Sequence, residues 1–145
     1  MIRPLAPADR VAWRALWRDY LAFYDTELPE TVFDTTFRRL TAEDVPEMAA
    51  FVAEIGGKPQ GLVHYIFHRH CWRPENVVYL QDLYVAPAAR GRGAGRALIE
   101  AVYAAADAAG SPSVYWMTQE FNQTARRLYD RVAQVTPFIK YQRPL

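Results

Sequence analysis

The sequence has a single cysteine, no long apolar run and almost no net charge. Because Cys71 is the only cysteine among the 145 residues, an internal disulfide is excluded and nothing indicates secretion. Seventeen Lys and Arg against sixteen Asp and Glu leave a formal charge of +1, which excludes a surface that binds nucleic acid by overall charge. The apolar runs are too short to cross a membrane, and Met1–Arg10 lacks the apolar stretch of a signal peptide. We therefore expect a cytoplasmic protein without a membrane partner.

The composition is that of an ordinary globular domain. Apolar residues make up 51% of the chain and charged residues 23%, and no repeat, low-complexity tract or linker interrupts it. A chain of this length usually forms one core, so we expect a single domain over residues 1–145. His68, His70 and Cys71 lie close together, but one histidine pair and one thiol do not supply the usual ligand count, so no metal is expected.

The spacing of apolar residues predicts an α/β fold with a mixed sheet. Gly56-Gly57 is a strong hairpin signal between two strands, and Asp9 is placed to cap the first helix. Predicted helices cover about 9–24, 31–40 and 95–109, and a fourth, capped by Asn122 or Thr124, reaches about 132. Predicted strands cover 51–55, 60–69, 77–85, 114–118 and 138–142. A hairpin followed by strand–helix–strand–helix–strand indicates a sheet with antiparallel and parallel parts.

The most informative stretch is Arg90–Arg96, which reads RGRGAGR between a predicted strand and a predicted helix. Glycines permit positive φ and remove side chains, so backbone N–H groups can converge on an anion there. The positive end of the following helix and three arginines add to the attraction, which predicts a pyrophosphate site. The loop is not a Walker motif, because Gly95-Arg96-Ala97 stands where Gly-Lys-Ser/Thr is needed, and its glycine spacing does not match a dinucleotide fingerprint.

Two motifs resemble those of the GNAT N-acetyltransferases. Arg90-x-x-Gly93-x-Gly95 follows Leu83-Tyr84-Val85-Ala86-Pro87 and opens a helix, and Asn122-x-x-Ala125-x-x-Leu128-Tyr129 stands on the next one. With the order of elements, the resemblance covers nearly the whole chain. It implies the GNAT fold, in which a mixed sheet is splayed between its fourth and fifth strands and helices cover both faces. The stretch Tyr79–Val85 looks most like the branch that acetylates polyamines and histones.

This resemblance implies a transfer of acetyl from acetyl-coenzyme A to a primary amine, directly in a ternary complex. The acceptor would be a small, polyamine-like or lysine-type amine. Tyr129 matches the general acid that protonates the leaving thiolate, and a backbone N–H near Leu83 would stabilise the oxyanion. The residues implied in binding the cosubstrate are Leu83, Tyr84, Val85, Arg90, Gly91, Arg92, Gly93, Ala94, Gly95, Arg96 and Asn122.

The sequence leaves the general base open. Polyamine acetyltransferases carry glutamate where this chain has Gln81, so this side chain marks the expected base position but cannot itself take a proton at neutral pH. Asp82, Glu120 and the histidines are the other candidates. Strand alternation would place Asp82 on the face opposite Gln81, which disfavours it. The acidic run Asp25, Glu27, Glu30 and Asp34 is either a solvated face or an attractor for a cationic amine.

A non-catalytic coenzyme A-binding sensor or interaction module is the alternative. Gln81 favours it, as does Asp130–Val135, where the family often has Gly-Phe after the tyrosine, whereas Asn122, Tyr129 and the complete loop favour an enzyme. No aromatic ladder alternates with the loop arginines, so no nucleic-acid partner is expected. Family analogy and the apolar stretch Phe138–Tyr141, a possible sheet edge, predict a homodimer.

Overall fold

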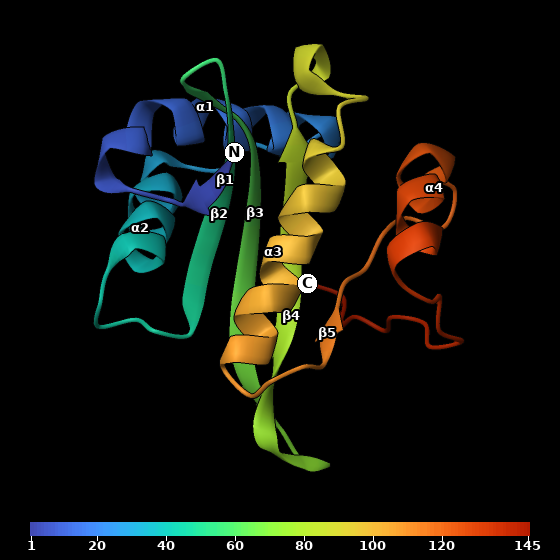
Figure 1. Cartoon of the computed structure of the whole chain (residues 1–145). Coiled ribbons are helices and arrows are strands. Elements are labelled where there is room, and N and C mark those ends of the chain that lie inside the picture. Colours follow the sequence, from blue (N-terminus) through green and yellow to red (C-terminus); the bar gives the residue numbers. More distant parts are fainter.

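The computed structural model describes all residues, 1–145, and contains one five-stranded mixed sheet (Figure 1). The strands lie in sequence order. Neighbouring strands pair antiparallel except β4 and β5, which pair in parallel. The strands are β1 (Ile2–Pro4), β2 (Met48–Ile55), β3 (Lys58–His70), β4 (Arg73–Val85) and β5 (Val114–Tyr115). The predicted α/β class with antiparallel and parallel parts is therefore confirmed.

Helices cover both faces of this sheet, as predicted (Figure 1). One face carries α1 and α2, the other carries α3, and α4 lies beside the β5 edge. The helices are α1 (Arg10–Phe23), α2 (Glu30–Thr41), α3 (Ala94–Ala108) and α4 (Gln123–Val132), with short 3-10 turns η1 (Pro7–Asp9) and η2 (Pro87–Ala89). No helix has both the length and the hydropathy that a bilayer-spanning segment needs.

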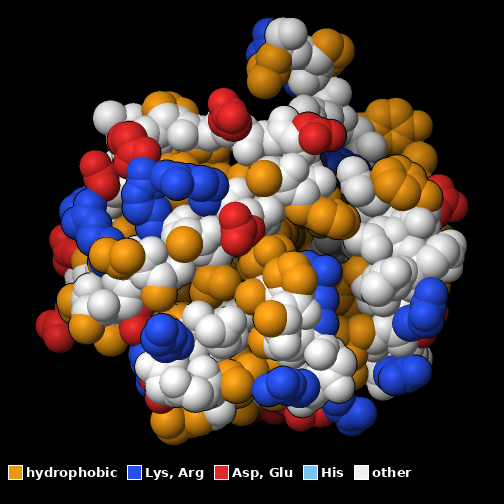
Figure 2. Space-filling view, turned by 90° about the horizontal axis from the view of Figure 1, so that it is seen from above, with side chains coloured by type: hydrophobic (Ala, Val, Ile, Leu, Met, Phe, Trp, Pro, Cys, Tyr) orange, Lys and Arg blue, Asp and Glu red, His pale blue; other side chains and the backbone are white.

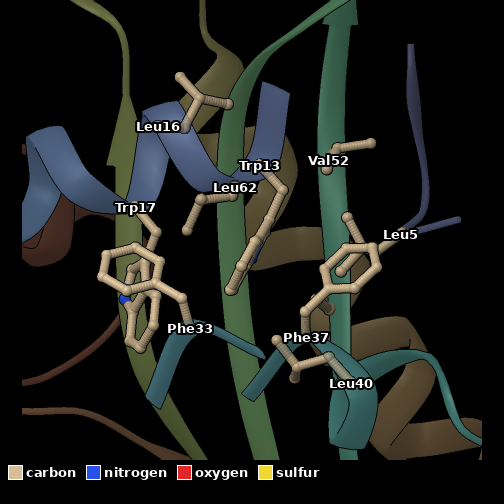
Figure 3. Packing of buried hydrophobic residues seen from close by; sticks show 10 residues of the cluster. Leu5, Trp13, Leu16, Trp17, Phe33, Phe37, Leu40, Val52 and Leu62 are labelled. Carbon is tan, nitrogen blue, oxygen red and sulfur yellow. The ribbon is translucent and has the colours of Figure 1, made fainter. Parts of the chain in front are cut away.

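The core is divided by the sheet into two apolar clusters. On the α1/α2 side, aromatic side chains dominate: Trp13 is 1% exposed and packs against Trp17 and Phe37 at centroid distances of 5.2 and 5.1 Å (Figure 3). On the α3 side, aliphatic residues dominate, with Leu98 and Ile99 fully buried. Successive side chains of β3 point to opposite faces of the sheet, which accounts for this division: Leu62 packs in the first cluster and Val63 in the second.

Two of the four residues in the acidic run Asp25, Glu27, Glu30 and Asp34 form ion pairs between α1 and α2. Asp34 pairs with Arg10 and Glu30 pairs with Arg14, and both ion pairs connect α1 to α2. These carboxylates already have cationic partners, so they do not act as free attractors for an amine. The expectation that this run is a solvated face describes Glu30 and Asp34 best, since both remain largely exposed.

Two predictions about the chain ends are wrong. Asp9 occupies the N-cap position of α1, but its side chain makes no capping hydrogen bond to that helix; its carboxylate accepts hydrogen bonds from the Arg3 guanidinium and from the Ala6 N–H, and these bonds lower its pKa. The predicted strand 138–142 does not form: the residues from 133 to 145 belong to no helix or strand. Since α4 ends at Val132 without the glycine that would reverse the chain, the tail continues as extended, exposed coil.

Candidate active site

A groove opens where β4 and β5 diverge, as the family resemblance implies. The two strands pair only at Val78–Val114 and Tyr79–Tyr115, after which the rest of β4 has no partner on that side. The groove has a volume of about 490 Å³, and Leu83, Tyr84 and Val85 line it. Seen from above, toward the carboxyl end of β4, hydrophobic side chains gather around a hollow in this surface (Figure 2). Unpaired backbone groups of β4 can therefore bind an extended ligand there.

The glycine- and arginine-rich loop forms one end of the groove. Gly91 and Gly93 both have φ of +79°, a conformation that favours glycine, and Gly93 is the N-cap of α3. The first N–H groups of α3 and the positive end of its dipole therefore meet at the groove. Arg90 donates from Nε to the Val85 carbonyl at 2.9 Å, and Arg96 pairs with Glu100 at 2.7 Å. This geometry fits a diphosphate.

The opposite wall of the groove is α4. Asn122 caps this helix, its Oδ1 accepting from the Ala125 N–H at 3.2 Å, so its amide N–H₂ remains available to a ligand. A Cβ at Gly95 would lie 3.2 Å from Leu128 Cδ2, so glycine at this position allows α3 and α4 to approach closely. Of the residues implied in cosubstrate binding, all line this groove except Arg92. Arg92 is exposed next to it on the loop.

Tyr129 lines the groove from α4, and its hydroxyl has no hydrogen-bond partner within the protein. The ring packs edge-on against Trp116 at a centroid distance of 5.4 Å. Burial, with a smaller contribution from Tyr24, raises the pKa of Tyr129 to about 12. The hydroxyl therefore keeps its proton through the physiological pH range and is available as a donor to a group in the groove.

A second cavity of about 230 Å³ lies between α1, α2 and the sheet, and both Gln81 and Asp82 line it. The expectation that Asp82 faces away from Gln81 is wrong, and the reason is a β-bulge. His64 pairs with Asp82 and Tyr65 with Leu80, so Gln81 has no partner across the ladder. The extra residue turns two consecutive side chains to the same face of β4.

Asp82 is held by a buried hydrogen-bond network. His64 Nδ1 lies 2.8 Å from Asp82 Oδ2, and Trp17 Nε1 donates to the same oxygen at 3.2 Å. Trp13 Nε1 donates to His64 Nε2 at 2.9 Å. The other carboxylate oxygen, Oδ1, accepts no hydrogen bond from the protein, and the Asp82 side chain keeps 11% exposure in the cavity that it lines. One oxygen is therefore fixed and the other is free for a ligand.

Tyr20 lies at the junction of the cavity and the groove. It lines the groove, and burial and the nearby negative charge of Asp82 raise its pKa. Tyr24 packs edge-on against Tyr20 at a centroid distance of 5.2 Å, and Tyr24 and Tyr129 line the same groove. Tyr20 is therefore close both to Asp82 in the cavity and to Tyr129 in the groove.

The other candidate bases lie elsewhere. Glu120 is exposed and lines neither the groove nor the cavity. His68 Nε2 is 2.8 Å from the Tyr115 hydroxyl, and His70 Nδ1 accepts from the Trp72 N–H at 3.1 Å. No group of three His, Cys, Asp or Glu side chains is arranged to hold a metal ion.

Comparison with protein families decides the classification. Residues 11–133 match the model of the GNAT acetyltransferase family. The chain belongs to the GNAT acetyltransferases. This membership makes it an acetyltransferase that uses acetyl-coenzyme A. The D-amino-acid N-acetyltransferase HPA3 of Saccharomyces cerevisiae is 40% identical to this GNAT acetyltransferase over 144 residues, which cover 99% of this chain and 89% of the yeast protein.

Solved structures share the fold of this GNAT acetyltransferase at low sequence identity. An aminoglycoside acetyltransferase, AAC(6')-Iy, in complex with a coenzyme A bisubstrate analogue has a TM-score of 0.85 at 19% identity, over 100% of this chain and 97% of that one. A ribosomal-protein-alanine N-acetyltransferase from Brucella melitensis biovar Abortus 2308 has a TM-score of 0.80 at 19% identity, over 100% and 99%. The expected fold is therefore confirmed.

The sequence contained a signal for the bulge that the strand prediction did not use. In the run Leu80-Gln81-Asp82-Leu83, two leucines stand three positions apart, so a regular strand would place them on opposite faces. Both leucines pack on the α3 side, which only an inserted residue allows. Of the residues in this network, the sequence offered Asp82 and His64 as candidate bases; no local motif distinguishes Tyr20 or the two tryptophans that donate to the network.

Proposed function

We propose that this GNAT acetyltransferase moves an acetyl group from acetyl-coenzyme A to a small primary amine, by direct transfer in a ternary complex. One observation carries the proposal. Gln81 and Asp82 line a cavity with a free carboxylate oxygen, and Leu83, the next residue of β4, begins the lining of the groove. A cationic amine in the cavity and a thioester along β4 would therefore meet at the bulge. The whole chain, 1–145, would act as a single domain.

The groove residues would bind acetyl-coenzyme A along its length. The N-terminus of α3, with Gly91, Gly93 and the loop arginines, would hold the diphosphate. Backbone groups of Leu83–Val85 and the Asn122 amide would hold the pantetheine arm, and the Leu83 N–H would donate to the developing oxyanion. The coenzyme supplies an activated acyl group on a thiol leaving group.

Asp82 and Tyr129 would handle the protons. An alkylamine with a pKa near 10 is mostly protonated at pH 7, so it must lose a proton before it attacks. Asp82 Oδ1 would accept this proton and return it to water. As the C–N bond forms and the C–S bond breaks, the Tyr129 hydroxyl would donate its proton to the departing sulfur, and the second amine proton would restore Tyr129 through solvent. The products are the N-acetylated amine, the coenzyme A thiol and one proton released to solvent.

Gln81 would act as a polar contact of the acceptor rather than as a base. Its side chain is exposed, lines the cavity and has no hydrogen-bond partner in the protein. An amide can accept a hydrogen bond from an ammonium or hold a water that relays a proton, but it does not ionise at neutral pH. The carboxylate that the Gln81 position lacks is supplied one residue later, by Asp82.

Similar proteins support an amine acceptor. HPA3 is named for D-amino acids, and structural neighbours of the same fold are named as aminoglycoside acetyltransferases. The resemblance of Tyr79–Val85 to the polyamine-acetylating branch points to primary amines as well. A non-catalytic coenzyme A-binding module remains the second candidate, favoured by the absence of a glutamate at Gln81.

Thiol release distinguishes the two functions. The purified chain is incubated with acetyl-coenzyme A and separate alkylamines, D- and L-amino acids, aminoglycosides and polyamines, and free thiol is measured. Transfer predicts saturable thiol release that depends on one class of amine. Tight binding of acetyl-coenzyme A in calorimetry without thiol release for any amine would instead establish the binding module.

A homodimer is the proposed assembly. The C-terminal tail exposes Phe138, Ile139 and Tyr141, which are 83, 76 and 89% exposed, respectively. Exposed apolar side chains in such number are typical of surfaces that meet a partner. The outer edge of β5 also has no strand beside it, so the tail of a second copy could pair there.

A further inference from the structure

The cavity that contains Asp82 has apolar walls and one charged end. Its walls are formed by Trp17, Leu28, Val32, Leu40, Met48 and Ile66, and its polar lining is limited to Thr36, His64, Gln81 and Asp82. No lysine or arginine lines it, and Asp82 is its only carboxylate. A ligand in this cavity therefore meets a single negative charge at one end and hydrocarbon over most of the remaining surface.

From this distribution we infer that the cavity selects a monoamine with one compact apolar substituent. The inference rests on the proposed acetyl transfer and names its substrate class. The ammonium would bind Asp82 Oδ1 beside the groove, and the substituent would extend between α1 and α2. A volume of about 230 Å³ is below the usual range for drug-sized ligands, about 300–1,000 Å³, so the substituent is small.

A second cationic group does not fit this cavity. The lining from α2 and β2 includes Val32, Leu40 and Met48, which offer no partner to a charge, and Leu40 belongs to the aromatic core cluster around Trp13. A charge placed there would lose its hydration without gaining a partner, which is costly. Polyamines are therefore poor acceptors, although the sequence between Tyr79 and Val85 resembles that of enzymes that acetylate them.

His64 is in the wall but does not offer a cation to an acceptor's carboxylate. Trp13 can only donate, so His64 Nε2 must accept and its proton must lie on Nδ1, toward Asp82. The imidazole is neutral in this arrangement, and both of its nitrogens are occupied. A carboxylate on the acceptor, if present, would have to point toward the mouth of the cavity rather than into it.

Two isosteric amines give the most direct test. Pentylamine and 1,4-diaminobutane have the same number of non-hydrogen atoms. Pentylamine ends in a methyl group where the diamine ends in a second ammonium. We expect kcat/KM to favour pentylamine by about 100-fold or more, and to rise about tenfold or more from ethylamine to butylamine. Equal or better use of the diamine would overturn the inference. No thiol release with either amine, despite coenzyme binding, would instead mean that the proposed function is wrong.

Substitutions on α2 locate the selectivity. Thr36→Glu adds a second carboxylate to the cavity lining and should reduce the preference for pentylamine at least tenfold, whereas Thr36→Val, of equal size, should keep the preference. Val32→Phe should lower kcat/KM for pentylamine about tenfold and should lower it less for ethylamine. Thr31→Phe, the same bulk on the exposed side of α2, is the matched control. If Thr31→Phe and Val32→Phe act alike, the acceptor does not enter this cavity.

Discussion

Trp13 fixes the proton position on His64. The indole Nε1 donates to His64 Nε2 at 2.9 Å, and because an indole nitrogen cannot accept, the imidazole must carry its proton on Nδ1. Nδ1 lies 2.8 Å from Asp82 Oδ2, so this proton is directed at the carboxylate. Through His64, the buried Trp13 thereby fixes the orientation of the Asp82 carboxylate, the group that we propose binds the acceptor.

Asp82→Asn should lower kcat/KM for alkylamines about 100-fold at pH 7, because it removes the proton acceptor and the charge that binds the ammonium. The loss should shrink as pH approaches 10, where the amine arrives neutral. His64→Asn, which can keep a donor toward Asp82, should retain more activity than His64→Leu. Initial rates from pH 6 to 10, with thermal melts, measure both effects. A loss that is constant across pH would show a structural role only.

Gly93→Val should weaken binding of acetyl-coenzyme A at least tenfold. Gly93 has φ of +79°, and a β-branched residue resists this conformation, so the N-terminus of α3 would move away from the diphosphate. Gly57→Val is the matched control, since Gly57 has φ of +77° in the β2–β3 turn and lines neither the groove nor the cavity. Calorimetry on both folded variants checks the difference. Equal affinities would contradict the assignment of the loop.

Tyr129→Phe should lower kcat about 100-fold and change coenzyme affinity little, because the ring remains and only the proton donor is lost. Tyr103→Phe is the control; its hydroxyl donates to the Val132 carbonyl outside the groove, so it should affect stability rather than kcat. Since the pKa of Tyr129 is raised to about 12, the parent should show no alkaline loss of kcat from this group below about pH 11. A twofold effect or less on kcat would assign Tyr129 to packing.

Gln81→Glu should raise kcat/KM for alkylamines between about pH 6 and 8, mainly by lowering KM at low salt. The side chain is exposed in the acceptor cavity, so an added carboxylate remains hydrated and the melting temperature should change little. Gln134→Glu adds the same charge on the exposed tail and serves as control. If the Gln81→Glu profile overlays the parent for every amine, Gln81 does not contact the acceptor.

Deletion of residues 136–145 should convert a dimer to a monomer. The tail carries exposed Phe138, Ile139 and Tyr141 and makes no strand in the isolated chain, so contact with a second copy is the proposed reason for its apolar character. Light scattering on the intact chain should give twice the 16.6 kDa chain mass at micromolar concentration. One 16.6 kDa species from the intact chain would contradict the homodimer.

The sequence predicted the features that depend on local patterns. Helical periodicity located all four helices, and the glycine spacing from Gly91 to Gly95 located the loop, because positive φ and close approach leave few alternatives to glycine. The missed features depend on partners distant in the chain. Asp82 faces the cavity only because β3 pairs across a bulge, and His64 is tied to Trp13, 51 residues earlier. The absent strand at 138–142 has a strand-like composition but no neighbour within the chain.

A single-turnover experiment tests direct transfer at the junction of the groove and the cavity. Enzyme in excess over acetyl-coenzyme A carrying a radiolabelled acetyl group is quenched with and without pentylamine, and protein, coenzyme and amine are separated. We expect no label on the protein at any time, and complete passage of the label to N-acetylpentylamine when the amine is present. Label on the protein before the amine is added would contradict direct transfer. Label that remains in the thioester with every amine tested would contradict the enzyme.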